Sequence, residues 1–232
     1  MRTHYYFGWF NAAIPKEVVY ALNDDILDKR SLVIISSIPA DYEYTDKMFD
    51  FARDIWFEPA GVSFERYSSI DYRTEKKTAH ELIHNASAIL LHGGHPDLLN
   101  KFLIDYELSA VIEKSNASVI MGASAGGMNM GAKWVNRRTN PPEVRDGLGF
   151  DHLAVNSHVL FEDAEALSHD EYTVNYLMPL SKSIDVYVAC EESTIRIKNG
   201  RLDVMGHVYL IADSNIQKLD ETLNQTPRWD NY

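Results

Sequence analysis

Apolar runs and helical segments alternate along the first 130 residues, and this alternation limits the possible folds more than any other feature of the sequence. Residues 5–10, 31–38, 63–70, 88–91 and 119–121 have the length and composition of strands. Segments with apolar residues at helical spacing lie between them, and we expect Pro15 and Pro96 to open two of these helices and Thr45 to cap another. Such a βαβ rhythm predicts an α/β fold with a mostly parallel sheet, whose functional crevice lies at the carboxyl ends of the strands.

The rhythm changes after residue 130. We expect a loop over residues 133–149, a strand over 153–160, a helix over 165–180 and short strands over 185–190 and 193–198. Asn199-Gly200 predicts a two-residue hairpin turn, after which residues 204–211 are expected to return as one strand. No internal repeat, linker or low-complexity tract divides the chain, so we expect a single domain over residues 1–232.

The composition argues against several classes of function. A net charge of -12 disfavours nonspecific binding to nucleic acid or anionic lipid, because both surfaces repel an acidic chain. The first residues lack a long apolar stretch and the sequence has no run of about eighteen apolar residues, so we expect no signal peptide and no membrane association. The single cysteine, Cys190, excludes an intrachain disulfide and fits a cytoplasmic location. The sequence does not predict the oligomeric state.

The strongest chemical signal lies in residues 118–131. There an apolar run leads into Gly122-Ala123-Ser124-Ala125-Gly126, which fits the G-x-S-x-G pattern of a nucleophile elbow. A sharp turn between strand and helix presents the serine hydroxyl to a base, and the N–H groups that open the helix suit a developing oxyanion. The alternative is a glycine-rich turn that binds a phosphate or has no chemical role.

A serine nucleophile needs a histidine base and an acid that orients the histidine. His158 lies near the end of a candidate strand and His207 lies within another, and spacing alone does not decide between them. The chain order of α/β-hydrolases favours His207, with Asp185 or Glu192 as the acid.

Four short segments together carry a family resemblance: Leu91-His92-Gly93-Gly94, Gly122-Ala123-Ser124-Ala125-Gly126, Asn156-Ser157-His158 and Ala189-Cys190-Glu191-Glu192-Ser193-Thr194. With this set the chain resembles the dipeptidase E and cyanophycinase family of serine peptidases over most of its length. The resemblance implies a class I glutamine amidotransferase-like domain. Such a domain is a flavodoxin-like three-layer sandwich with a mostly parallel sheet, here followed by a C-terminal hairpin.

The resemblance also implies roles for individual residues. Ser124 matches the nucleophile, His158 the base and Glu192 the acid, or Glu191 if the alignment slips by one residue. Gly94 matches the oxyanion-hole position, with the Ala125 N–H as the second donor. The implied activity is hydrolysis of a small peptide or isopeptide bond without a cofactor.

The chain departs from the family pattern at two places that concern the substrate. His95 stands where the family usually has asparagine, and residues 159–180 contain no lysine or arginine, although many members carry arginines there. If an acidic substrate group is recognised, we expect Arg137 and Arg138 to hold it, with Lys133 as the nearest other cation. The alternative is that both arginines are solvated and that the site prefers neutral or basic substrates.

Other candidate groups are expected to be structural. No elbow precedes Cys190, which we predict to be a buried core thiol. His84, His92 and His95 lack the spacing of a helix-borne metal pair, so we expect no metal site. Three functional classes remain open. They are a serine peptidase, an esterase of α/β-hydrolase fold that uses His207, and a non-catalytic binding protein with the amidotransferase-like fold.

Overall fold

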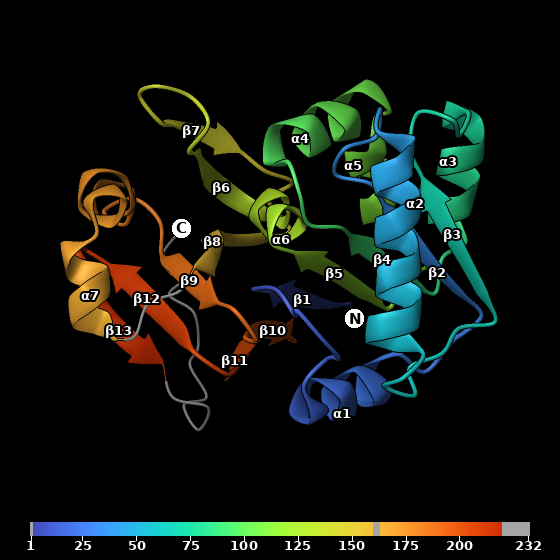
Figure 1. Cartoon of the computed structure of the whole chain (residues 1–232), viewed down its shortest axis with the longest axis horizontal. Coiled ribbons are helices and arrows are strands. Elements are labelled where there is room, and N and C mark those ends of the chain that lie inside the picture. The colour runs from blue at the N-terminus through green and yellow to red at the C-terminus, as the bar shows by residue number, and fades with distance from the viewer. Residues whose placement is uncertain (1, 160–162, 220–232) are drawn as a thin grey trace.

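Two mixed β-sheets form the framework of the molecule (Figure 1). The computed structural model describes residues 2–159 and 163–219, with the backbone alone at residues 158 and 159. The first sheet has the order β11-β10-β1-β5-β4-β2-β3, and its strands β1, β5, β4, β2 and β3 run parallel. Its strands are β1 (Thr3–Phe7), β2 (Ser31–Ile35), β3 (Arg66–Ile70), β4 (Ala88–Leu91), β5 (Val119–Ala123), β10 (Thr194–Lys198) and β11 (Arg201–Met205). The predicted mostly parallel sheet is therefore confirmed over the first 130 residues.

Helices cover both faces of the parallel strands. They are α1 (Lys16–Asp25), α2 (Tyr42–Phe51) with its π-helical continuation η1 (Ala52–Phe57), α3 (Lys76–His84), α4 (Pro96–Asp105) and α5 (Leu108–Glu113). Successive residues of a strand point to opposite faces, so Leu32 and Ile34 pack with α1 and η1, whereas Val33 and Ile35 pack with α3, α4 and α5. Burial on both faces explains why β2, β4 and β5 are nearly continuous apolar runs.

The cap predicted for the second helix is wrong. Asp41 caps α2, because its side chain accepts a hydrogen bond from the Tyr44 N–H at 3.0 Å. Thr45 lies inside the helix, where its buried hydroxyl is 2.7 Å from the Ser36 hydroxyl. Both residue types suit a cap, and the tertiary contact with Ser36 accounts for the threonine.

The second sheet was not predicted. It has the order β13-β12-β9-β8-β6-β7, with β6, β8 and β9 parallel. Its strands are β6 (Gly131–Asn136), β7 (Glu143–Asp146), β8 (Asp151–Val159), β9 (Val186–Cys190), β12 (Val208–Ala212) and β13 (Asn215–Leu219). The loop expected over residues 133–149 is wrong, because this stretch contains the antiparallel pair of β6 and β7. Every residue of the edge strand β7 is exposed, so that strand has no apolar pattern.

The strand expected over residues 204–211 is also wrong. The chain leaves β11 at Met205, turns through Gly206 with φ of 77°, and enters β12 in the other sheet. The Asn199-Gly200 turn does join β10 to β11 as predicted, with φ values of 55° and 73°. The helix expected over residues 165–180 is divided into α7 (Ala164–His169), η2 (Thr173–Leu177) and α8 (Met178–Leu180).

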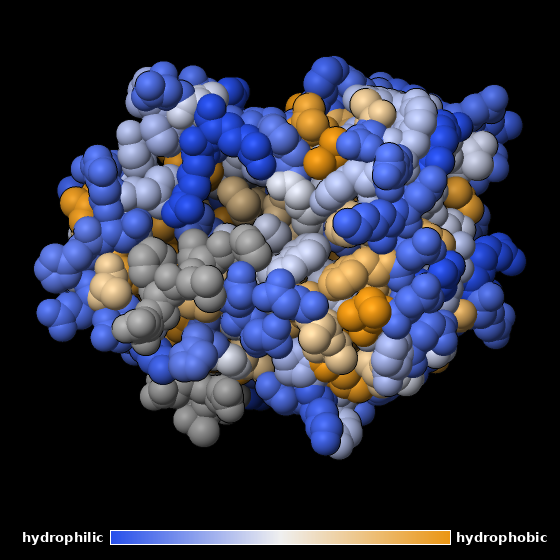
Figure 2. Space-filling model, viewed as in Figure 1, coloured by the Kyte–Doolittle hydropathy of each residue, from blue (hydrophilic) through white to orange (hydrophobic). Residues whose placement is uncertain are grey.

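The two sheets share a core. One buried cluster contains Tyr6 and Ile120 from the first sheet together with Leu153 and Tyr187 from the second. The short helix α6 (Ala125–Met130) leads from β5 in the first sheet directly to β6 in the second. Figure 2 shows mainly hydrophilic residues on one face, with apolar residues in small separate patches. No helix in the described residues is both long and apolar enough to cross a bilayer.

Candidate active site

Ser124 occupies a strained turn at the carboxyl end of the central strand β5. Its backbone has φ of 47° and ψ of -110°, a region that residues with side chains rarely adopt. The Ser124 N–H donates to the Phe7 carbonyl at 3.0 Å, and the Ser124 carbonyl accepts from the Met128 N–H at 3.0 Å. The serine is therefore held by β1 on one side and by α6 on the other, in the strained turn that the sequence predicts.

Small residues make this turn possible. A Cβ atom on Gly126 would lie 1.9 Å from the Leu91 carbonyl oxygen of β4. A Cβ atom on Gly122 would lie 2.6 Å from the Gly126 carbonyl carbon. The start of α6 thus packs directly on the backbone of two strands, which forces the chain to reverse sharply at Ser124.

The glycine pair after β4 faces the same crevice. Gly94 has φ of 139°, and a Cβ atom on it would lie 2.3 Å from the Ser37 Oγ and 2.4 Å from the Tyr44 Oη. The Gly93 carbonyl accepts hydrogen bonds from the Ser37 hydroxyl and, at 2.7 Å, from the Tyr44 hydroxyl. In the described part of the chain, the Gly94 N–H has no hydrogen-bond acceptor.

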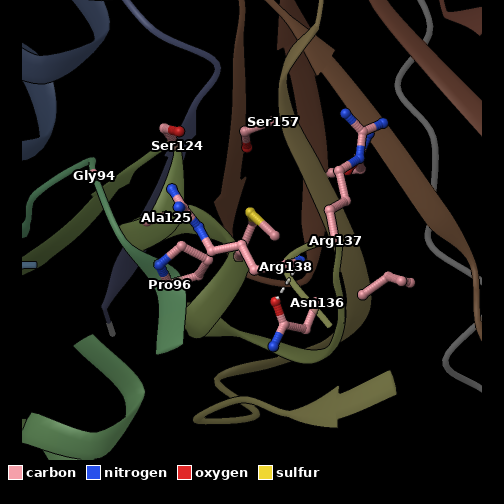
Figure 3. Close-up of a pocket in the computed structure, with 11 residues that line it drawn as sticks. Gly94, Pro96, Ser124, Ala125, Asn136, Arg137, Arg138 and Ser157 are labelled. Atoms are coloured by element: carbon pink, nitrogen blue, oxygen red, sulfur yellow. Dashed lines mark hydrogen bonds between the residues drawn. The ribbon is translucent and has the colours of Figure 1, made fainter. Parts of the chain in front are cut away.

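One hollow beside Ser124, of about 290 Å³, brings together five of the predicted site residues (Figure 3). Its lining residues are Gly94, Pro96, Ser124, Ala125, Met128, Val135, Asn136, Arg137, Arg138, Asn156 and Ser157. They come from the ends of β4, β5, β6 and β8 and from the segments that follow those strands. No motif in the sequence points to Asn136, although it follows an apolar pair, Trp134-Val135, that indicates a buried strand.

The two arginines of this hollow differ in direction. In Figure 3 the Arg138 side chain extends toward Ala125, whereas the Arg137 side chain points away from Ser124. The Arg137 guanidinium lies 3.6 Å from the centre of the Tyr172 ring. Burial and the nearby positive charge of Arg138 lower the pKa of His95 below its usual value. Both arginines line the hollow, but only the Arg138 side chain extends toward Ala125.

A second hollow, of about 440 Å³, shares Gly94 and Ser124 with the first. Trp9, Asn11, Tyr44, Met48, Gly94 and Ser124 line it, and none of them is charged. The Trp9 ring is parallel to that of Phe51 at 6.0 Å and meets Trp56 edge-on at 5.1 Å. Aromatic packing thus holds the Trp9 ring in place as one wall.

The predicted acids lie in the turn between β9 and β10. Glu192, with φ of 59°, donates its N–H to the Trp9 carbonyl at 2.8 Å. Its carboxylate accepts from the Asn11 N–H at 3.3 Å, and the Glu191 carboxylate accepts from the Asn11 side-chain amide at 3.0 Å. Asn11 also lines the second hollow, so both acids contact a residue that shares this hollow with Ser124.

His158 lies in β8, next to the strand that leads to these acids. The pairing of β8 with β9 shifts register between Ser157 and Val159, and Val159 is opposite Cys190, the residue before Glu191. Such a bulge re-aims side chains and is frequent near active sites. The His158 side chain lies outside the described residues, so its role as a base remains a prediction. In the described part of the chain, the buried Ser157 Oγ has no hydrogen-bond partner.

The other histidines and the cysteine have different surroundings. His207 is exposed at the bend between β11 and β12, where its carbonyl accepts from the Cys190 N–H at 3.1 Å. Cys190 is a buried core residue, as predicted. Burial lowers the pKa of His92 to about 4, and its ring is stacked on Trp56 at 5.7 Å. Within residues 2–159 and 163–219, no three His, Cys, Asp or Glu side chains are grouped so that they could hold a metal ion.

A serine in a strained strand-to-helix turn, at the carboxyl ends of parallel strands, is the arrangement of a serine hydrolase. Comparison with known families makes the class specific. Residues 38–205, well over half of the chain, match peptidase family S51. The chain belongs to this family, which includes dipeptidase E and cyanophycinase, and is a serine-type peptidase. The sequence left three functional classes open, and the chain falls into the first of them, the serine peptidases.

Solved structures show the same fold. The chain is similar to a peptidase from an acI-B1 Actinobacterium, with a TM-score of 0.74, 17% identity and 97% coverage of both chains. It is also similar to a protein from Listeria monocytogenes EGD-e that is described as a peptidase E. For that protein the TM-score is 0.55 and the identity 12%, with 95% of this chain and 100% of the other covered. No curated protein matches the sequence.

Proposed function

We propose that the chain is a dipeptidase E-like hydrolase that cleaves a small peptide or isopeptide bond through Ser124, His158 and Glu192. The observation that carries the proposal is the position of Ser124. It lies in a strained turn, between two hollows, and shares the lining of both with Gly94. A scissile bond placed across this junction has its carbonyl group beside the nucleophile and one half of the substrate in each hollow.

In the proposed mechanism, the Ser124 Oγ attacks the carbonyl carbon while His158 accepts the hydroxyl proton. The carbonyl oxygen becomes an oxyanion that accepts hydrogen bonds from the N–H groups of Gly94 and Ala125. The C–N bond then breaks, and the leaving amine takes the proton from His158. Water hydrolyses the acyl-enzyme by the same steps, and Glu192 orients His158 throughout.

The two hollows support a small substrate. Their volumes, about 290 and about 440 Å³, lie near the lower end of the range of ~300–1,000 Å³ that is usual for small-ligand sites. Each accommodates roughly one amino-acid residue, so a dipeptide or a short isopeptide fills the crevice. A protein substrate requires a longer groove.

A fluorophosphonate probe with mass-spectrometric mapping tests the nucleophile. We expect the probe to label Ser124 and Ser124→Ala to abolish both labelling and turnover, since alanine fits the same turn. His158→Ala should be nearly as severe, because members of a triad act as one unit. Glu192→Gln should cost less, and a matched Glu191→Gln variant shows which acid is used. Full activity in His158→Ala together with its loss in His207→Ala contradicts the proposed triad.

The substrate preference is tested with matched dipeptides that contain Asp, Ala or Arg. Arg138→Ala should raise KM for the acidic dipeptide about tenfold or more and spare the neutral one, because it removes a charged hydrogen bond. Arg137→Ala gives the comparison at the other arginine of the hollow, and we expect a smaller effect because that guanidinium is stacked on Tyr172. If the wild-type enzyme cleaves neutral and basic dipeptides as well as the acidic one, the arginine does not select the substrate.

A further inference from the structure

Several polar side-chain groups surround the Gly93 carbonyl oxygen. The Ser37 hydroxyl, two residues beyond β2, and the Tyr44 hydroxyl, on α2, both donate to this oxygen. The His92 Nδ1 lies 3.1 Å from the same atom. Ser37 is fully buried and Tyr44 partly buried, so water does not compete freely for these bonds.

The geometry of the peptide transmits this constraint to Gly94. The peptide between Gly93 and Gly94 is trans, so its carbonyl oxygen and its N–H point in opposite directions. With the oxygen bound to Ser37 and Tyr44, the N–H lies in the same peptide plane and points away from these two hydroxyls, on the opposite side of the C–N bond. That N–H has no acceptor among the described residues, and Gly94 lines both hollows beside Ser124.

We infer that Ser37 and Tyr44 are positioning residues that orient and polarise the oxyanion-hole donor, the Gly94 N–H, through the Gly93 carbonyl. The inference rests on the proposed function, because it assigns a role to an amide that the proposed mechanism uses. Hydrogen bonds to the oxygen of a peptide strengthen donation by its N–H, since bonds in a chain polarise one another. The two hydroxyls thus act on the oxyanion without touching the substrate carbonyl.

The same arrangement explains the glycine at position 94. The space that a Cβ atom would fill is occupied by the two hydroxyls, at 2.3 Å for Ser37 and 2.4 Å for Tyr44. A side chain at this position would displace both donors from the Gly93 oxygen. Burial raises the pKa of the Tyr44 phenol, which keeps its proton available for donation.

The rate of phosphonylation by a small ethyl fluorophosphonate tests the inference without a known substrate. In this reaction the Ser124 Oγ forms a bond to phosphorus, fluoride leaves, and the hydroxyl proton passes to the base. The phosphoryl oxygen occupies the oxyanion hole, and the ethyl groups of the probe are too small to fill the hollow beside Trp9. Removal of an oxyanion-hole donor costs about 10²–10³ in rate. We therefore expect a smaller loss of about tenfold for Tyr44→Phe or Ser37→Ala, and a larger one for the double variant.

Tyr42→Phe is the matched control, because Tyr42 lies on the same helix with its ring against Arg73 and has no bond to Gly93. We expect this variant to react at the wild-type rate. With a cleaved dipeptide, Tyr44→Phe should lower kcat about tenfold and leave KM within about twofold, as expected for a contact made only in the transition state.

Two outcomes overturn the inference and leave the proposed function intact. One is wild-type phosphonylation in the double variant while Ser124 remains the labelled residue. The other is an increase in KM alone, which makes Tyr44 a wall of the second hollow and no more. Labelling at a residue other than Ser124 instead refutes the proposed function itself.

Discussion

At the scale of single residues, the backbone conformation that presents the Ser124 hydroxyl lowers the stability of the fold. Its φ of 47° and ψ of -110° suit glycine, and a residue with a Cβ atom in such a region costs about 1–3 kcal/mol. The surrounding structure enforces this conformation through the hydrogen bonds to Phe7 and from Met128. The strain therefore belongs to the turn that presents the nucleophile.

Replacement of Ser124 by glycine should release this strain. We expect Ser124→Gly to have a free energy of unfolding about 1 kcal/mol above that of Ser124→Ala. The relief of strain exceeds the entropy that glycine adds to the unfolded chain. Urea denaturation of the two inactive variants measures the difference. A less stable Ser124→Gly variant would show that the turn is not strained.

At the scale of elements, α6 is the piece on which the site depends. All six of its residues are buried, and it joins the strand that carries Ser124 to the second sheet. Its glycines allow it to lie against backbone rather than side chains. The closest approach is at Gly126, where a Cβ atom would overlap the Leu91 carbonyl of β4 at 1.9 Å.

Gly126→Ala should therefore destabilise the protein by about 3 kcal/mol or more, since the clash is with backbone that cannot rotate away. Gly127→Ala is the control on the same helix, because its Cβ atom would lie 3.1 Å from the Gly122 carbonyl oxygen. We expect this variant to lose no more than about 1 kcal/mol, as the better helix propensity of alanine offsets part of the contact. Equal losses in urea denaturation would argue against close packing of α6 on β4.

At the scale of the whole molecule, a buried ion cluster connects the end of α1 to the first sheet. The fully buried Asp25 carboxylate accepts hydrogen bonds from Tyr5 of β1 at 2.6 Å and from Arg196 and Lys198 of β10 at 2.6–2.9 Å. Burial by itself raises the pKa of this carboxyl, but the bonds from Arg196, Lys198 and Tyr5 outweigh it and hold the pKa below its usual value. The charged form of Asp25 therefore stabilises the fold.

This stabilisation should depend on pH. Because the pKa of Asp25 is lower in the folded state, its contribution is complete above the ordinary aspartate pKa of about 4 and is lost as the pH falls below that value. We expect Asp25→Asn to cost about 2–3 kcal/mol at pH 7, since it removes the charge that accepts from Arg196 and Lys198, although Arg196 keeps its ion pair with Asp203. The difference from wild type should shrink toward pH 2. Asp24→Asn, at the exposed neighbour, is the control. Chemical denaturation at several pH values measures the free energies of unfolding. If the difference between wild type and Asp25→Asn does not change with pH, the charge of Asp25 has no such role.

The local pattern of the sequence determined the parallel half of the fold and the turn at Ser124. Apolar runs predict strands buried on both faces, and small residues on both sides of a serine predict a sharp turn, because both signals depend only on neighbours in the chain. The hairpin at Asn199-Gly200 was predictable for the same reason, since left-handed backbone conformations favour these two residues. The glycine at position 94 was found through the family resemblance.

Only the tertiary structure decided the rest. The edge strand β7 has no buried residue and hence no pattern, and the break at Gly206 depends on which sheet each neighbouring strand joins. Ser37 and Tyr44 stand 56 and 49 residues from Gly93, and no local signal relates them to it. The two adjacent arginines differ because Arg137 stacks on Tyr172, a residue of another element. Contacts of this kind arise where strand ends and helices meet in space, so their partners are set by the order of the strands in the sheets.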